Sequence, residues 1–213
     1  MLERLKYLGL AFGVLALDIF ASSFVFRSTD SLLVLLFIQG ILLTALGLIV
    51  WIGWKSRLLT FSLKAVKKYL PWIFLGYTGI LMTNFLGAWI LELEGFTNTV
   101  NQEIINNSLA HSPASLMFLT IVCLAPLAEE IICRGLIPRL VFKGYERWGY
   151  LLGGLLFAVL HGPTNLGSWV IYGGMSAIVT YLAYRSKSLE VPIALHLLNN
   201  GIAFLLLLIL GTG

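Results

Sequence analysis

Long apolar runs follow one another along almost the whole chain, separated by short polar or basic stretches. A run of about 20 apolar residues can cross the hydrocarbon core of a membrane as a helix. We expect the spans at residues 5–26, 32–54, 71–91, 114–140, 148–161, 166–183 and 191–210. The fifth run is too short to cross alone unless a bend or neighbouring backbone helps it. The pattern predicts an all-α, polytopic transmembrane bundle of about seven spans, forming a single integral membrane domain over residues 1–213.

Two stretches interrupt this pattern with different chemistry. In residues 55–70, five cations alternate with apolar side chains, which predicts a basic amphipathic helix lying on the membrane surface. In residues 92–112 there are three acids and no Lys or Arg, so we expect a polar loop on the other side of the membrane. The first apolar run follows Arg4 and Lys6, as in a signal peptide, but its length and Asp18 within it favour a retained helix.

The composition supports a membrane protein and excludes a soluble globular domain, because 59% of the residues are hydrophobic and only 11% are charged. The net charge of +4 does not indicate a nucleic-acid partner, since the 14 Lys and Arg are dispersed in short loops. Arg27 lies on one side of the membrane, Arg134 lies inside a span, and the other twelve share the opposite side. These twelve are Arg4, Lys6, Lys55, Arg57, Lys64, Lys67, Lys68, Arg139, Lys143, Arg147, Arg185 and Lys187. The asymmetry predicts a cytoplasmic N-terminus, and we expect a prokaryotic cell membrane.

Three ionisable residues occupy the fourth span: Glu129, Glu130 and Arg134. Each costs at least about 2.5 to 3.5 kcal/mol at the centre of a bilayer, so such residues mark a functional site. Glu130 and Arg134 are four residues apart with the acid first, which lets them pair along one helix face. Glu129 points about 100° away from Glu130 and needs a polar neighbour from another helix.

The candidate neighbours are His161, His196 and Asn200. Counting helical rise from the nearest loop cations places Glu130, His161 and Asn200 at about 20 Å depth and His196 at about 13 Å. His196 and Asn200 are four residues apart and share a helix face. These depths predict one polar layer inside the bundle.

In this order the residues form three motifs: Glu-Glu-x-x-x-Arg at Glu129, Phe-x-x-x-His at Phe157, and His-x-x-x-Asn at His196. The set resembles the CPBP intramembrane proteases, the family that includes the type II CAAX prenyl endopeptidases and the bacterial Abi proteins. The resemblance covers the chain from about residue 114 to its end. It implies a glutamate-dependent intramembrane endopeptidase that hydrolyses a membrane-associated, prenylated or precursor peptide without a metal.

The resemblance also implies roles for these residues. Glu129 and His161 would activate a water for attack on a peptide carbonyl. His196 and Asn200 would donate hydrogen bonds to the developing oxyanion. The supporting residues would be Glu130 with Arg134 as a structural pair and Phe157 packed beside the site. We expect the access cavity to open toward the side that carries the cations, where His196 is shallowest.

Several alternatives stay open. Zinc bound by Glu129, His161 and His196 is the less favoured mechanism, because the two histidines lie on separate helices and no His-Glu-x-x-His motif is present. A non-catalytic immunity or scaffold protein of the same fold is possible, and so is a proton-coupled transporter, although the two halves show no repeat. The partners that we expect are a peptide or protein substrate and the lipid bilayer. Gly149 and Gly153 form a G-x-x-x-G spacing that favours close internal packing over a dimer face.

Overall fold

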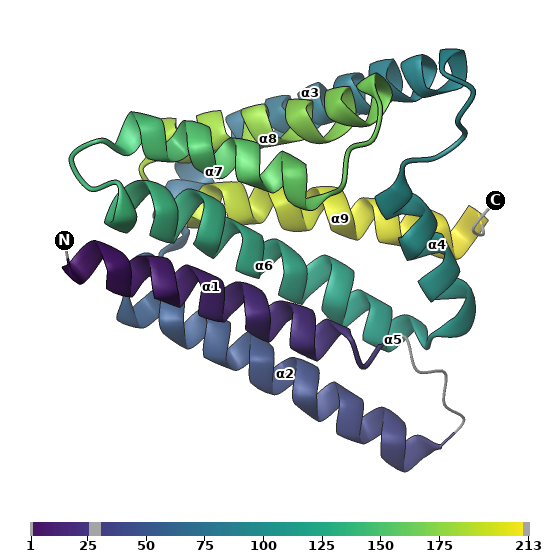
Figure 1. Ribbon diagram of the computed structural model, residues 1–213, viewed down its shortest axis with the longest axis horizontal. Helices are drawn as coiled ribbons and strands as arrows, with labels where there is room; N and C mark the ends of the chain where they lie inside the picture. The colour runs from purple at the N-terminus through teal and green to yellow at the C-terminus, as the bar shows by residue number, and fades with distance from the viewer. Residues whose placement is uncertain (1, 26–30, 211–213) are drawn as a thin grey trace.

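A computed structural model describes residues 2–25 and 31–210, and these residues form helices and loops without any strand (Figure 1). The separate helices are α1 (Leu2–Ser22), α2 (Leu32–Lys55), α3 (Leu63–Leu93), α4 (Val100–His111), α7 (Glu146–Leu160), α8 (Leu166–Ser186) and α9 (Glu190–Leu210). One further continuous helix covers residues 114–141. Its four segments are α5 (Ala114–Met117), η1 (Phe118–Leu124), α6 (Ala125–Glu130) and η2 (Ile131–Val141), in which η denotes π-helical geometry.

Six of these helices are long and apolar enough to cross a membrane: α1, α2, α3, α8, α9 and the helix over residues 114–141. The remaining predicted span corresponds to α7, which has only 15 residues and packs against η2 and α8. The all-α membrane bundle of about seven spans is therefore confirmed. The chain is an integral membrane protein.

The two polar or basic stretches, residues 55–70 and 92–112, differ in detail from expectation. The basic segment is not a separate surface helix, because a loop ends near Ser62 and the helix that begins at Leu63 runs without a break into the third span. Pro71 does not end this helix, since a proline removes only one backbone hydrogen bond within it. The polar stretch contains α4, which begins where the Thr99 hydroxyl accepts a hydrogen bond from the Gln102 amide.

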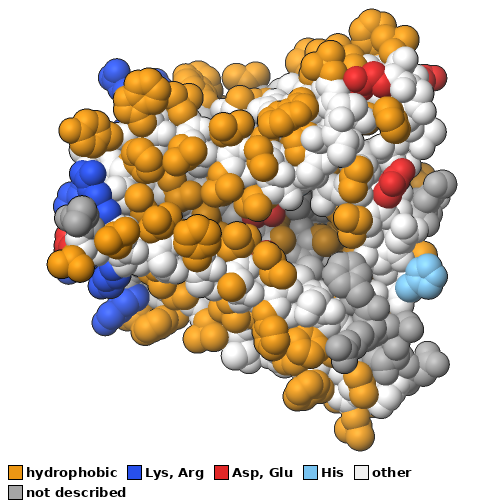
Figure 2. Space-filling model, in the orientation of Figure 1, with side chains coloured by type: hydrophobic (Ala, Val, Ile, Leu, Met, Phe, Trp, Pro, Cys, Tyr) orange, Lys and Arg blue, Asp and Glu red, His pale blue; other side chains and the backbone are white. Residues whose placement is uncertain are grey.

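The charges are distributed as a membrane requires. On the face shown in Figure 2, Lys and Arg gather at one end, hydrophobic side chains cover the middle, and most of the visible acids and a histidine lie toward the other end. The cation end joins the start of α1 to the loop before α7, where the Arg4 guanidinium donates to the Lys143 carbonyl at 2.9 Å. Arg27 lies outside the described residues.

The helix over residues 114–141 is the centre of the bundle, since 61% of its most apolar window is buried, against at most 44% in the other spans. In its π-helical parts each amide donates to the carbonyl five residues earlier, as the Ala125 amide does to Thr120 and the Phe142 amide does to Ile137. Pro138 lies inside η2, and Pro126 directly follows Ala125, the residue that makes the last such bond of η1. Neither proline has an amide hydrogen. Each proline therefore leaves the carbonyl five residues before it, Ile121 or Cys133, available to another helix.

The short helix α7 uses the second of these carbonyls. Gly153 lies so close to it that an added Cβ would come 2.0 Å from the Cys133 oxygen, and a Cβ on Gly149 would come 2.5 Å from the Pro138 Cα. Both distances are too short for any side chain. The G-x-x-x-G spacing thus serves close internal packing of α7 against η2, as expected from the sequence.

A similar approach joins α3 to α8, where Gly87 and Gly167 face one another and an added Cβ on either would lie within 2.8 Å of the other's carbonyl oxygen. The start of α8 is fixed by two acceptors. Glu94 accepts hydrogen bonds from the Leu166 and Gly167 amides, and the Asn165 side chain accepts one from the Ser168 amide. These contacts hold the start of α8 beside the end of α3.

Gly153→Ala should destabilise the protein by about 1 to 3 kcal/mol or more, because the new methyl group would overlap a backbone oxygen that cannot move alone. The matched control is Gly173→Ala in α8, where a Cβ would meet nothing within 4 Å and the better helix propensity of Ala favours stability. Thermal unfolding in detergent measures both. Equal melting temperatures for the two variants would contradict this packing.

Candidate active site

The fully buried ion pair predicted from the sequence is present. Arg134 Nη1 lies 3.1 Å from Glu130 Oε1, and neither side chain has any solvent exposure. The rest of the guanidinium is satisfied by α8, because Nη2 donates to the Ser176 carbonyl and hydroxyl and Nε donates to the Thr180 hydroxyl. The Phe157 ring of α7 lies 4.3 Å from the guanidinium carbon. One buried charge thus joins the central helix to α7 and α8.

The same Glu130 oxygen also binds α9. His196 Nδ1 lies 2.9 Å from Glu130 Oε1, and this oxygen already accepts the Arg134 hydrogen bond, so the imidazole nitrogen is the donor. The other ring nitrogen, Nε2, then faces Glu129, whose Oε2 atom is 3.8 Å away. His196 is therefore the polar neighbour from another helix that Glu129 required.

Glu129 is more accessible to a water or a substrate than Glu130. Its side chain is 19% exposed, whereas that of Glu130 is completely buried. Its Oε2 atom is buried without any hydrogen bond among the described residues. Asp18 of α1 lies close enough for its charge to act on Glu129, and its Oδ1 atom also lacks a partner within the described part of the chain. A carboxylate in this state can accept a proton or a hydrogen bond from a water.

His161 ends α7 and faces the same region. Its Nδ1 atom lies 2.8 Å from the Phe157 carbonyl oxygen, which can only accept, so Nδ1 carries the proton and Nε2 keeps its lone pair. The ring is held between two aromatic rings, with Phe157 at 4.5 Å and Tyr172 at 4.6 Å between centroids. Tyr172 is fixed in turn by a 2.6 Å hydrogen bond between its hydroxyl and that of Thr99. The Phe157 ring also contacts His196 at 5.5 Å, so it lies against both histidines.

Asn200 is positioned by a backbone carbonyl of the central helix. Its Nδ2 atom donates to the Ile121 carbonyl at 2.8 Å, which is the carbonyl that Pro126 leaves unbonded. Its Oδ1 atom accepts from Asn199 at 3.1 Å. An amide nitrogen has two hydrogens, so one remains for a ligand.

A cavity of about 400 Å³ is lined by three of these side chains and opens to the surface. His161, His196 and Asn200 line its inner part. Residues of α3, α8 and α9 form its walls, and residues 97–102 before and within α4 form its outer part. The expectation that the cavity opens toward the cations is therefore wrong. It extends to the end that carries α4, because its lining includes Leu91 near the end of α3, residues 97–102 and Leu207 near the end of α9.

The sequence thus located most of the cluster but not its internal contacts. The structure brings Glu129, Glu130, Arg134, Phe157 and His196 into one connected group, with His161 touching Phe157 and Asn200 on the cavity wall. The residues that the sequence analysis missed include a polar set on α8 spaced by four residues, which was a usable signal in an apolar span. They are Tyr172, Ser176 and Thr180.

The structure does not bring together the three residues of the zinc alternative, Glu129, His161 and His196, as metal ligands. Among the described residues, no three His, Cys, Asp or Glu side chains are grouped as they would be around a metal ion. Glu129 and His196 face one another, but His161 directs its Nδ1 atom to a carbonyl. Both cysteines, Cys123 and Cys133, are free thiols.

Arg134→Met should lower the free energy of unfolding by about 3 to 5 kcal/mol, because it leaves the buried Glu130 carboxylate without its cation. The double variant Glu130→Gln/Arg134→Met should recover part of this loss, since the introduced glutamine is neutral and its oxygen still accepts the His196 hydrogen bond. Glu129→Gln should change stability least. Melting temperatures in one detergent test the order, and identical values for the single and double variants would show that the pair carries no coupling.

Comparison with known proteins finds one matching family and two relatives. The family described as Type II CAAX prenyl endopeptidase Rce1-like matches residues 111–202, a range that contains all seven residues of the three motifs. The UPF0177 protein YvdC of Lactococcus lactis subsp. lactis (strain IL1403) is 31% identical over 146 residues, covering 67% of this chain and 56% of that protein. The membrane-embedded CAAX protease MroQ of Staphylococcus aureus (strain USA300) is 28% identical over 153 residues, covering 67% of this chain and 60% of that protein.

The chain thus spans less than two thirds of the length of either relative. No solved structure matches it significantly. The matched range begins just before the central helix and ends just after Asn200, so it contains the buried ion pair, both cavity histidines and the asparagine. Over residues 111–202 the chain is similar to the Rce1-like family of type II CAAX prenyl endopeptidases.

Proposed function

We propose that the chain is an intramembrane endopeptidase in which Glu129 is the general base. The observation that carries this proposal is the contrast between the two neighbouring acids. Each acid has a buried Oε2 atom without a hydrogen bond among the described residues. Glu130 is completely buried and its Oε1 atom is bound by Arg134 and His196, whereas Glu129 is 19% exposed and faces His196 at 3.8 Å. A structural ion pair alone would not need a second, unpaired carboxylate beside it. The family and the relative named as a CAAX protease support the assignment of peptide hydrolysis.

A water fits between the two groups that face each other at this position. A distance of 3.8 Å between Glu129 Oε2 and His196 Nε2 is too long for a direct hydrogen bond. A water at about 2.8 Å from both atoms would bridge them. In the proposed mechanism Glu129 accepts the proton of this water, and the resulting hydroxide adds to the peptide carbonyl carbon.

The cavity side chains supply the remaining functions. The two hydrogens of this water go to Glu129 and to the Nε2 lone pair of His161, while His196 with a proton on Nε2 donates to the water oxygen. The free amide hydrogen of Asn200 and the Nε2 atom of His196, when it carries a proton, donate to the oxyanion as the carbonyl becomes tetrahedral. The proton held by Glu129 then passes to the leaving amine. No step in this scheme requires a metal, and a chelator tests the zinc alternative directly.

The cavity favours an extended peptide segment as the substrate. Its walls are mostly apolar in the span and become polar at residues 97–102, where Asn and Thr side chains provide donors and acceptors. A precursor peptide or a lipidated tail attached to the membrane would present both an apolar and a polar part. We therefore propose a membrane-associated peptide as the substrate class.

Glu129→Gln should lower cleavage by about 10² to 10⁴-fold while leaving the fold intact, since it keeps the volume and removes the base. His161→Ala should also abolish most cleavage. The assay uses the full chain in lipid nanodiscs and a proteome-derived peptide library, with new peptide termini read by mass spectrometry. The matched control is Glu3→Gln, because Glu3 is an exposed acid at the start of α1. This variant should cleave like wild type.

A chelator and a prenylated probe complete this experiment. Cleavage that survives the chelator supports metal-free hydrolysis, and its loss and recovery with zinc would assign the metal mechanism. A farnesylated CAAX peptide compared with its unprenylated copy measures the need for a lipid. A folded wild-type protein that cleaves nothing in either format would favour the scaffold alternative and contradict the proposal.

We further infer that the cation end faces the cytoplasm and the cavity mouth faces the opposite side. Lys and Arg at one end and acids at the other support this orientation, and the organisms of the two relatives support a prokaryotic cell membrane.

On intact cells, an impermeant maleimide should label Asn107→Cys, which is exposed on α4. It should label Lys67→Cys, exposed near the start of α3, only after permeabilisation. The wild-type protein reports any background from its half-buried Cys123. The reverse pattern of labelling would invert the orientation and place the cavity mouth in the cytoplasm.

A further inference from the structure

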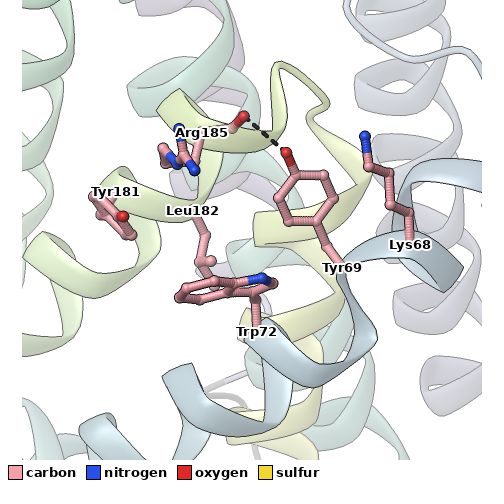
Figure 3. Close-up of a pocket in the computed structure, with 6 residues that line it drawn as sticks. All are labelled: Lys68, Tyr69, Trp72, Tyr181, Leu182 and Arg185. Atoms are coloured by element: carbon pink, nitrogen blue, oxygen red, sulfur yellow. Dashed lines mark hydrogen bonds between the residues drawn. The ribbon is translucent and has the colours of Figure 1, made fainter.

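A second cavity lies at the cation end, remote from the residues that form the catalytic cluster. It has a volume of about 290 Å³ and is formed by α3 and α8, the two helices that pack against each other most extensively. Its lining consists of three residues from each helix: Lys68, Tyr69 and Trp72 from α3, and Tyr181, Leu182 and Arg185 from α8 (Figure 3). In each set the third residue follows the first two by four and three residues, so it lies on the same helix face as both.

Two cations flank this cavity without an acidic partner. Both Lys68 and Arg185 are exposed, and they come from different helices (Figure 3). Between them the Tyr69 hydroxyl donates to the Arg185 carbonyl at 3.0 Å, which fixes the backbone of α8 against α3. Every ion pair among the described residues lies in the buried catalytic cluster, so no described carboxylate neutralises either charge. The cavity therefore offers two positive charges to a ligand.

The aromatic side chains indicate where this cavity lies relative to the membrane. Trp72 is 46% exposed and Tyr181 is 52% exposed, one on each side of the cavity. Exposed Trp and Tyr next to cations are typical of the boundary between headgroups and hydrocarbon. Leu75, one turn further along α3 into the span, is also exposed and continues the surface with an apolar side chain. A ligand here meets cations at its polar end and hydrocarbon below.

We propose that this cavity binds the phosphodiester headgroup of an anionic phospholipid, with the phosphate between Lys68 and Arg185 and an acyl chain along α3 beside Trp72. A net negative headgroup fits better than phosphatidylcholine, because the choline cation of the latter would add a third positive charge to two that are already unpaired. Basic pockets between membrane helices bind anionic headgroups in this manner. The bound lipid would join α3 to α8 at the cation end, where the Tyr69 hydrogen bond already connects them.

Native mass spectrometry of the full chain released from nanodiscs tests this site. With equal amounts of phosphatidylglycerol and phosphatidylcholine in the disc, wild type should retain phosphatidylglycerol about tenfold over phosphatidylcholine. Lys68→Gln/Arg185→Gln should lose this preference. The matched control Lys64→Gln/Lys67→Gln removes two exposed charges from the same helix end without touching the cavity, and it should keep the preference.

The variants and a competition with phosphate distinguish a lipid bound in the cavity from unspecific attraction of lipids by charge and from a site for free phosphate. Unchanged retention by Lys68→Gln/Arg185→Gln would overturn the proposal, and so would equal loss in both double variants, which would indicate unspecific attraction by the basic end. Inorganic phosphate added in detergent should not displace the lipid. If it binds alone and competes, the site recognises free phosphate and the lipid assignment fails. Melting temperatures in phosphatidylcholine alone should agree for all three proteins, because the altered side chains are exposed.

Discussion

The positive charge of Arg134, buried where neither water nor lipid headgroups reach it, is the constraint on which the arrangement of this bundle depends. A guanidinium in that position is tolerated only if all its hydrogens and its charge are satisfied by protein. The partners come from three directions: Glu130 on its own helix, the Ser176 and Thr180 side chains on α8, and the Phe157 ring on α7. Glu130 extends the network to His196 on α9. The position of each of these helices around the central one is therefore tied to a single side chain.

The two prolines of the central helix leave backbone carbonyls that other helices contact. Pro138 lies inside the π-helical segment η2 and Pro126 directly follows the end of η1, and each lacks the amide that would bind the carbonyl five residues earlier. The carbonyl freed by Pro126 positions the Asn200 side chain, and the carbonyl freed by Pro138 receives the glycine surface of α7. A regular α-helix would offer neither acceptor, since its carbonyls are used internally. The same local distortion thus builds part of the proposed active site and brings the short helix α7 against the core.

Much of the fold and part of the site could be predicted from the sequence, and the division has a physical reason. Helix spans, the Glu130–Arg134 pair and the common depth of the polar residues all follow from rise and rotation along single helices. The direction of the cavity does not, because it depends on how side chains from α3, α4, α8 and α9 fill the space between them. For the same reason, the sequence could not show that His196 lies between both acids. The continuity of α3 through Pro71 was missed because a change from basic to apolar composition does not require a helix to end.

The segment around α4 is more than a connection between two spans, because it reaches the catalytic cluster through the start of α8. Thr99, which begins α4, is hydrogen-bonded to the hydroxyl of Tyr172, and the ring of Tyr172 lies flat against His161. The stacking ring on one face and the hydrogen bond from Nδ1 to the Phe157 carbonyl together fix the plane of the imidazole. Its remaining nitrogen must then point in a direction set by α4, α7 and α8 jointly. Since residues 97–102 also line the outer part of the cavity, the surface that a substrate meets first is continuous with the surface that orients the histidine.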